Sequence, residues 1–353
     1  MPSKRTDDGP DLTSSPKPPQ PLHPSIISRL DPEYITFHNK YFQYVTPSHT
    51  RPWDPSSRIP PPSGTFPSTE TDPLEVGGIK DWKVGTRSGR EGTKARVRVY
   101  TPKGEAPISG WPVVFFIPGG GWVYGGLDNQ ASFSTNMCVR AKCVVVSLDH
   151  RLAPEDPYPA ALEDAIDALR WLVQNASDLL RVDTTRIAVA GCSSGGNIAA
   201  ALVLTAPQLN LPIHIIFQLL LVPALDNTAS TSTSWHINQH APWLTPERML
   251  WFRGMYLPNK SDWATWETSP ILAPGELLRG VPETWIAIGG ADILMEEGRK
   301  YGDRLKGEGV QVEVRLYEGG PHAVAVMDGD VMHLGRRLVT DAVDALSQAF
   351  STV

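Results

Sequence analysis

Cysteine is scarce in this chain, and its cysteines are irregularly spaced. Cys138, Cys143 and Cys192 are too few for a disulfide framework or a zinc cluster, and they fit a reducing compartment. Basic blocks are lacking too: the formal net charge is −6, which argues against a nucleic-acid-binding or anionic-membrane-binding surface. The longest apolar run, at 213–221, is far shorter than the ~20 residues that a membrane-spanning helix needs.

The chain also shows no recognisable targeting signal. Its first 24 residues contain no apolar stretch of the secretory type, and its last three residues carry no retention or peroxisomal address. We therefore expect a cytoplasmic protein with a small-molecule partner, no nucleic acid and no membrane span. A homodimer is compatible with this composition.

The chain nevertheless has the composition of a large globular domain. Apolar residues make up 41% of its 353 residues, enough for a sizeable core. The pattern divides it into a disordered tail rich in proline and charge (1–24), a segment with a short amphipathic helix pair and a proline-rich loop (25–75), a first core part (76–225), an aromatic insertion (226–268) and a second core part (269–353).

Short β-branched or aromatic runs alternate with helical patterns in both core parts. The predicted strands are 95–100, 112–117, 143–148, 186–190, 214–221, 284–288 and 312–317. The predicted helices between them are 130–140, 160–174, 195–205, 296–307 and 333–350. This alternation predicts an α/β fold with a mostly parallel sheet covered on both faces. The insertion carries its own helix, which begins at Thr245-Pro246-Glu247, and it is typical of a lid or cap.

A serine follows the strand at 186–190 in a glycine-flanked turn. The sequence there is GCSSG (191–195), the G-x-S-x-G pattern that joins a strand to a helix through a sharp turn. The positions two before and two after the central residue must be nearly free of side chain, and only Ser193 has glycine at both. We predict Ser193 as a nucleophile. The alternatives are a turn that merely caps a helix, and Cys192 as nucleophile, although the turn should point Cys192 away from the cleft.

Three successive glycines follow the strand at 112–117, in the sequence PGGGW (118–122). Their bare backbone amides can approach a ligand closely and can stabilise negative charge that develops on a carbonyl oxygen. The predicted oxyanion-hole donors are the N–H groups of Gly120, Gly121 and Ser194. A flexible glycine loop without a ligand is the alternative interpretation.

Five motifs together resemble the hormone-sensitive-lipase-like branch of the α/β-hydrolases. They read PGGGW (118–122), DHRLAPE (149–155), GCSSGGN (191–197), DILMEEG (292–298) and GGPHAV (319–324). The resemblance extends over about residues 76–350. It implies an eight-stranded α/β-hydrolase core, a helical cap built from the N-terminal segment and the insertion, and hydrolysis of small or medium acyl esters without cofactor or metal.

The sequence also offers a candidate acid and a candidate base to act with Ser193. Asp292 and His322 each follow a predicted strand, and the chain order Ser193, Asp292, His322 is the order expected for this fold. The base must reach the serine, and the carboxylate must fix the tautomer of the base. Glu296 and Glu297, one helical turn further on, are alternative acids.

The chain departs from the family pattern at three places. The family's histidine before the glycines is Pro118, its elbow has Cys192 and Ser194 where aspartate and alanine are usual, and Ala323 replaces a glycine after the late histidine. These departures suggest an atypical pocket or tuned activity.

Aromatic residues are predicted to line an apolar cleft over the serine, although each ring could instead pack the cap onto the core. The candidates are Trp122, Trp235, Trp243, Trp251 and Phe252.

The resulting hypothesis is a serine carboxylic-ester hydrolase. Lactone opening, amide hydrolysis or acyl transfer at the same site would use the same triad, so the sequence leaves these reactions open. A ligand receptor on the same fold is a further alternative, and the presence of His322 argues against it.

Overall fold

A computed structural model describes residues 17–59, 67–85 and 94–352 of the chain. The predicted disordered tail falls largely outside these residues, since 1–16 are not described. Residues 17–23 contain neither helix nor strand.

One eight-stranded sheet forms the centre of the molecule, with the strand order β1-β2-β4-β3-β5-β6-β7-β8. The strands are β1 (Gly78–Gly85), β2 (Lys94–Thr101), β3 (Trp111–Ile117), β4 (Val144–Asp149), β5 (Val182–Cys192), β6 (Ile215–Leu221), β7 (Glu283–Ala291) and β8 (Val312–Pro321). β2 runs antiparallel to both of its neighbours, and the pairs from β4 to β8 are parallel. All seven predicted strands are present. β1 was not predicted, because it lies at the sheet edge and only Val84 is buried in it.

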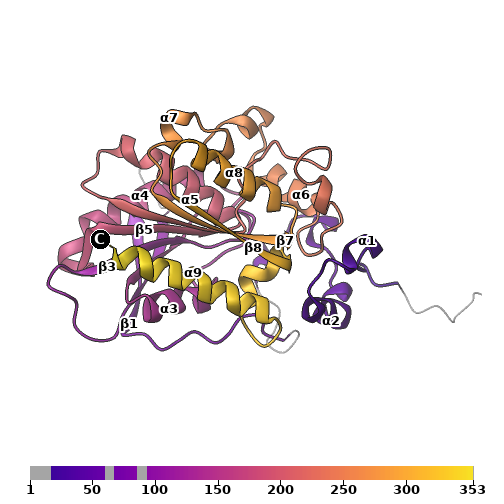
Figure 1. Cartoon of the computed structure of the whole chain (residues 1–353), viewed down its shortest axis with the longest axis horizontal. Helices are drawn as coiled ribbons and strands as arrows, with labels where there is room; N and C mark the ends of the chain where they lie inside the picture. Colours follow the sequence, from indigo (N-terminus) through magenta and orange to yellow (C-terminus); the bar gives the residue numbers. More distant parts are fainter. Residues whose placement is uncertain (1–16, 60–66, 86–93, 353) are drawn as a thin grey trace, which may run out of the picture.

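Helices cover both faces of the sheet, as the apolar strand pattern predicted (Figure 1). In β3, Val113 and Phe115 join the core beneath one helical layer, whereas Val114 and Phe116 join the core beneath the other. The first layer contains α4 (Ala160–Gln174), α5 (Ser194–Thr205) and α8 (Met295–Gly307). The second contains α3 (Ala131–Arg140) and α9 (His333–Ser351).

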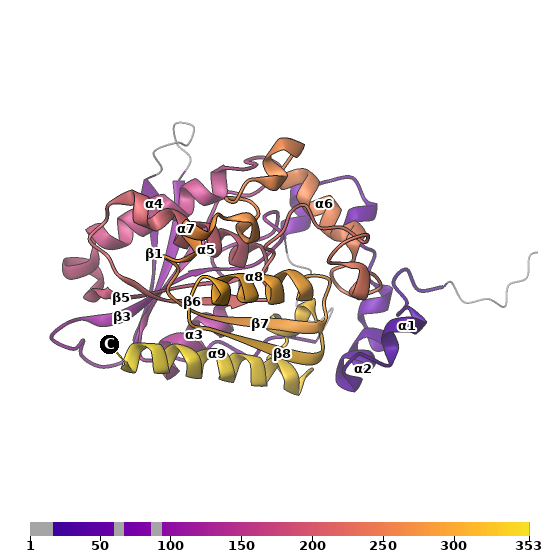
Figure 2. The ribbon, with the colours of Figure 1, turned by 45° about the horizontal axis from the view of Figure 1, so that its top comes forward.

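Two segments that are far apart in the sequence gather at the carboxyl ends of the parallel strands (Figures 1 and 2). They carry the short helices α1 (Pro24–Ile27) and α2 (Pro32–Lys40), and α6 (Pro246–Tyr256) of the insertion. A further short helix, α7 (Gly275–Leu278), precedes β7. The two segments contact each other directly: Phe42 stacks on Trp243 with ring centroids 4.5 Å apart.

The helix of the insertion begins where its sequence predicts. Thr245 is the N-cap residue, and its hydroxyl accepts a hydrogen bond from the backbone N–H of Arg248, while Pro246 occupies the first turn. The cap therefore has a defined helix start directly above the carboxyl edge of the sheet, where open α/β folds hold their sites.

Candidate active site

Ser193 lies at the sharp turn between β5 and α5. Its backbone angles are φ 53° and ψ −117°, a strained conformation for a residue with a side chain. The glycines on either side are required by close contacts: a Cβ on Gly191 would lie 2.3 Å from the carbonyl oxygen of Gly195, and a Cβ on Gly195 would lie 2.0 Å from that of Ile117. The turn can therefore close only with glycine at these two positions.

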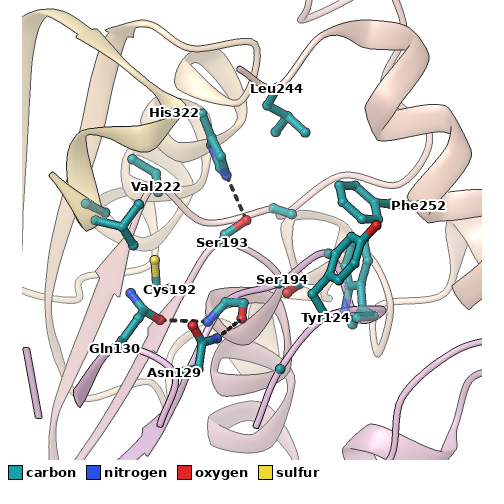
Figure 3. Close-up of a pocket in the computed structure, with 18 of the residues that line it drawn as sticks. Tyr124, Asn129, Gln130, Cys192, Ser193, Ser194, Val222, Leu244, Phe252 and His322 are labelled. Atoms are coloured by element: carbon teal, nitrogen blue, oxygen red, sulfur yellow. Dashed lines mark hydrogen bonds between the residues drawn. The ribbon is translucent and has the colours of Figure 1, made fainter. Parts of the chain in front are cut away.

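The structure brings the predicted base and acid to this serine. His322 follows β8, and its Nε2 lies 2.8 Å from Ser193 Oγ (Figure 3). Its Nδ1 lies 2.8 Å from Oδ2 of Asp292, which is buried at the end of β7. The other carboxylate oxygen of Asp292 accepts a hydrogen bond from the backbone N–H of Leu294. An alcohol, an imidazole and a carboxylate thus form one continuous hydrogen-bonded row.

The two alternative acids have other partners. Glu296 forms an ion pair with Arg299 on the exposed side of α8. Glu297 is buried and accepts hydrogen bonds from the backbone amides of Leu225 and Asp226. Neither carboxylate is hydrogen-bonded to His322, so Asp292 is the acid that the geometry supports.

Three backbone amides next to Ser193 are available to a ligand. Over residues 17–59, 67–85 and 94–352, the N–H groups of Gly120, Gly121 and Ser194 donate no hydrogen bond to protein. Gly120 and Gly121 have φ values of +146° and +62°, a region that favours glycine. A Cβ on Gly120 would also lie 2.0 Å from the carbonyl oxygen of Tyr124. Glycine is therefore required at this bend of the loop.

Two side chains that were not predicted from the sequence bind the backbone N–H and the carbonyl oxygen of Gly119, the residue before these glycines. Gln130 Oε1 accepts a hydrogen bond of 2.8 Å from the Gly119 amide, and Asn129 Nδ2 donates one of 2.6 Å to the Gly119 carbonyl (Figure 3). Gln130 has a left-handed backbone conformation, with φ 55°. The loop that begins at Pro118 is thus held without a histidine. A left-handed residue has no clear sequence signature, so these contacts were not predictable.

Cys192 contributes to the wall of the cavity above Ser193, so the expectation that it would point away from the cleft is wrong. Its side chain is nevertheless buried, and burial raises the pKa of the thiol to about 12. A thiol that stays protonated at neutral pH is a poor nucleophile, which leaves Ser193 as the nucleophile that the site supports.

A cavity of about 570 Å³ opens over Ser193 and His322. Of the predicted aromatic residues, Trp122, Trp243 and Phe252 line it. The prediction is wrong for the other two. Trp235 is fully buried, and its indole N–H donates to Glu297, while Trp251 packs on Trp53 and Phe252 outside the cavity. The side chains that the sequence analysis did not identify include Tyr124, Val222, Leu244, Arg248 and Met249.

The part of the chain that the structure describes contains no cluster of three or more histidine, cysteine or carboxylate side chains arranged to hold a metal ion. None of the helices in that part is both long enough and apolar enough to cross a bilayer.

Comparison with known proteins agrees with this architecture. Residues 114–326 match the model of a protein family described as having the alpha/beta hydrolase fold. An AB hydrolase superfamily protein of Schizosaccharomyces pombe is 39% identical over 338 residues, which are 94% of this chain and 97% of the relative. Carboxylesterase NlhH of Mycobacterium tuberculosis is 40% identical over 227 residues, covering 63% of this chain and 68% of the enzyme.

Solved structures agree as well. Esterase LipW from Mycobacterium marinum superposes with a TM-score of 0.67 at 35% identity, covering 77% of this chain and 82% of that one. An alpha/beta hydrolase enzyme from the metagenome of Lake Arreo superposes with a TM-score of 0.79 at 27% identity, over 92% of this chain and 99% of that one.

Proposed function

The chain belongs to the α/β-hydrolase family, in its hormone-sensitive-lipase-like branch, and from that premise we propose that it hydrolyses carboxylic esters through an acyl-enzyme on Ser193. Relatives over most of the core are carboxylesterases and esterases by name, which supports a carboxylesterase-type hydrolase. The proposal extends to the triad, the oxyanion hole and small or medium acyl groups, with no cofactor.

The hydrogen-bonded row gives each residue a role. His322 Nε2 accepts the proton of Ser193 Oγ while that oxygen attacks the ester carbonyl, and Asp292 stabilises the imidazolium that results. The amides of Gly120, Gly121 and Ser194 donate to the oxyanion. His322 then returns the proton to the leaving alcohol, and water releases the acyl group by the same steps. The single observation that carries the proposal is the pair of 2.8 Å contacts that His322 makes, one to Ser193 and one to Asp292.

Substitution of the serine tests this proposal. Ser193→Ala should lower kcat for p-nitrophenyl butyrate by at least about 10³-fold, because no alcohol remains to form the acyl-enzyme. It should also abolish covalent labelling by a fluorophosphonate probe.

The neighbouring serine is the matched control. The hydroxyl of Ser194 is buried without a hydrogen-bond partner, and only its backbone N–H is assigned a role. Ser194→Ala should therefore retain labelling and turnover. Equal activity of Ser193→Ala and the wild-type protein would refute the triad, and analysis of the products with added alcohols or amines would separate hydrolysis from acyl transfer.

A further inference from the structure

A cationic side chain without an anionic partner lines the cavity above Ser193. Arg248, in the first turn of α6, belongs to the same cavity wall as Ser193 and His322. Its guanidinium donates one hydrogen bond, from Nη1 to the carbonyl oxygen of Trp243 at 2.8 Å. Its Nε is buried and has no acceptor. No carboxylate of residues 17–59, 67–85 and 94–352 forms an ion pair with it.

Arg58, the other arginine in the described part of the cavity wall, has an anionic partner. Arg58 donates to the carbonyl oxygens of Val123 and Ala153 and forms an ion pair with Glu155. Where the structure describes the cavity wall, its one carboxylate is that of Asp128, which is paired with Arg98. Among the described residues that line this cavity, Arg248 is therefore the cationic side chain without an anionic partner.

A fully buried arginine on the same helix shows how such a charge is normally accommodated. Arg253 lies between the rings of Trp235 and Trp263, 4.8 and 4.9 Å from their centroids, and it interacts electrostatically with Glu297. Among the described aromatic rings, Arg248 lies over that of Phe252, 5.6 Å from its centroid, and it has no carboxylate partner there. It also lies at the positive end of the helix dipole, where a cation is unfavourable.

The surroundings of Arg248 suit an anion rather than a neutral group. A guanidinium has five N–H donors and stays protonated at neutral pH, and it matches the two oxygens of a carboxylate. Tyr124, another residue of the cavity wall, lies near enough to interact electrostatically with Arg248. Its hydroxyl makes no hydrogen bond to the described part of the chain, and Figure 3 shows the ring beside Phe252.

We propose that Arg248 is a specificity-determining residue that binds an anionic group of the substrate, so that the preferred esters carry a carboxylate in addition to the scissile bond. Placing a half-buried charge without a partner is costly, and a substrate anion would reduce that cost. This inference rests on the proposed esterase function. The carboxylate could belong to the acyl or to the alcohol part of the ester, and the test distinguishes the two.

Two matched pairs of esters provide the test. Monomethyl adipate and methyl hexanoate differ by a carboxylate on the acyl side, and 4-acetoxybenzoate and phenyl acetate differ by one on the alcohol side. For one pair, the ratio of kcat/KM for the charged ester to that for the neutral ester should fall roughly 10- to 100-fold in Arg248→Met, the range expected for loss of a hydrogen-bonded ion pair. Arg248→Lys, which keeps the charge, should recover part of the ratio.

Controls separate this proposal from the esterase assignment. Arg299→Met removes a positive charge from the exposed side of α8 and should leave both ratios unchanged. If Arg248→Met lowers kcat/KM equally for the charged and the neutral esters, the anion site is refuted and the esterase assignment is unaffected. The same conclusion follows if the wild-type protein hydrolyses only the neutral esters. If the wild-type protein hydrolyses none of the four esters and is not labelled by a fluorophosphonate, the esterase assignment itself fails.

Discussion

At the scale of single residues, the glycine loop at 118–122 shows how a departure from a family motif is balanced by side chains elsewhere. Pro118 has no backbone N–H and no imidazole with which to hold the glycines that follow it. Asn129 and Gln130 instead bind the two sides of Gly119. The side chains that bind Gly119 lie 10 and 11 residues after it in the chain, and through Gly119 they fix the glycine amides that follow.

Loss of the Gln130 contact should therefore affect catalysis more than binding. Gln130→Met keeps the length of the side chain but removes the acceptor of the Gly119 amide, so the donors beyond it lose their fixed orientation. We expect kcat to fall by roughly 10- to 100-fold, less than removal of an oxyanion donor itself costs, while KM changes little. Steady-state kinetics with p-nitrophenyl butyrate measure both values.

Three further variants test whether a loss of kcat in Gln130→Met comes from the lost contact to Gly119. Gln130→Glu retains an acceptor and should recover most of kcat. Asn136→Ala removes a buried hydrogen bond to the carbonyl oxygen of Ser132 in the same helix, without touching Gln130, and should leave kcat unchanged. Pro118→His should change kcat less than Gln130→Met, since the loop is already held. A large gain of activity in Pro118→His would mean that the proline, not the glutamine, governs the loop.

At the scale of secondary-structure elements, Glu297 joins the loop after β6 to the start of α8. Its carboxylate accepts from the amides of Leu225 and Asp226 and from the indole of Trp235. Burial, together with the charge of Asp226, raises the pKa of Glu297 to about 8, despite these three hydrogen bonds. Leu225 and Asp226, where the insertion begins, are thus hydrogen-bonded to α8 through the Glu297 carboxyl group, which titrates near neutral pH.

This titration predicts a pH dependence of stability. The folded protein binds the proton of Glu297 up to about pH 8, whereas the unfolded chain releases it near its ordinary value of 4.5. The stabilisation from this proton is complete below about pH 4.5 and is lost as the pH rises toward 8. Glu297→Gln cannot titrate, so its melting temperature should fall less than that of the wild-type protein between pH 5.5 and pH 8.5.

Thermal unfolding at the two pH values measures this difference. Glu296→Gln, one residue earlier in an ion pair with Arg299, is the control, and its melting temperature should show the same pH dependence as that of the wild-type protein. Identical pH dependence of Glu297→Gln and the wild-type protein would show that Glu297 is already ionised in the folded state.

At the scale of the whole molecule, sequence reasoning succeeded where short-range patterns determine structure. The β-branched runs located seven strands and the glycine spacing located the turn at Ser193, because each depends on residues only a few positions apart. It failed where the answer depends on distant contacts. Nothing local distinguishes Trp235, which packs against Glu297, from Trp243, which lines the cavity. The unpaired state of Arg248 likewise becomes visible only once the neighbouring side chains are in place.

The two cores on either side of the sheet allow a last prediction, which concerns global stability. Phe115 and Phe116 are adjacent in β3 and fully buried, but they point into different helical layers. If the sheet is buried equally on both faces, Phe115→Ala and Phe116→Ala should each lower the free energy of unfolding by about 3–5 kcal/mol. Urea denaturation followed by tryptophan fluorescence measures both, and Ile108→Ala, at a fully exposed position, should change it by less than about 0.5 kcal/mol. A large loss for only one phenylalanine would mean that a single helical layer forms the stable core and that the other packs loosely.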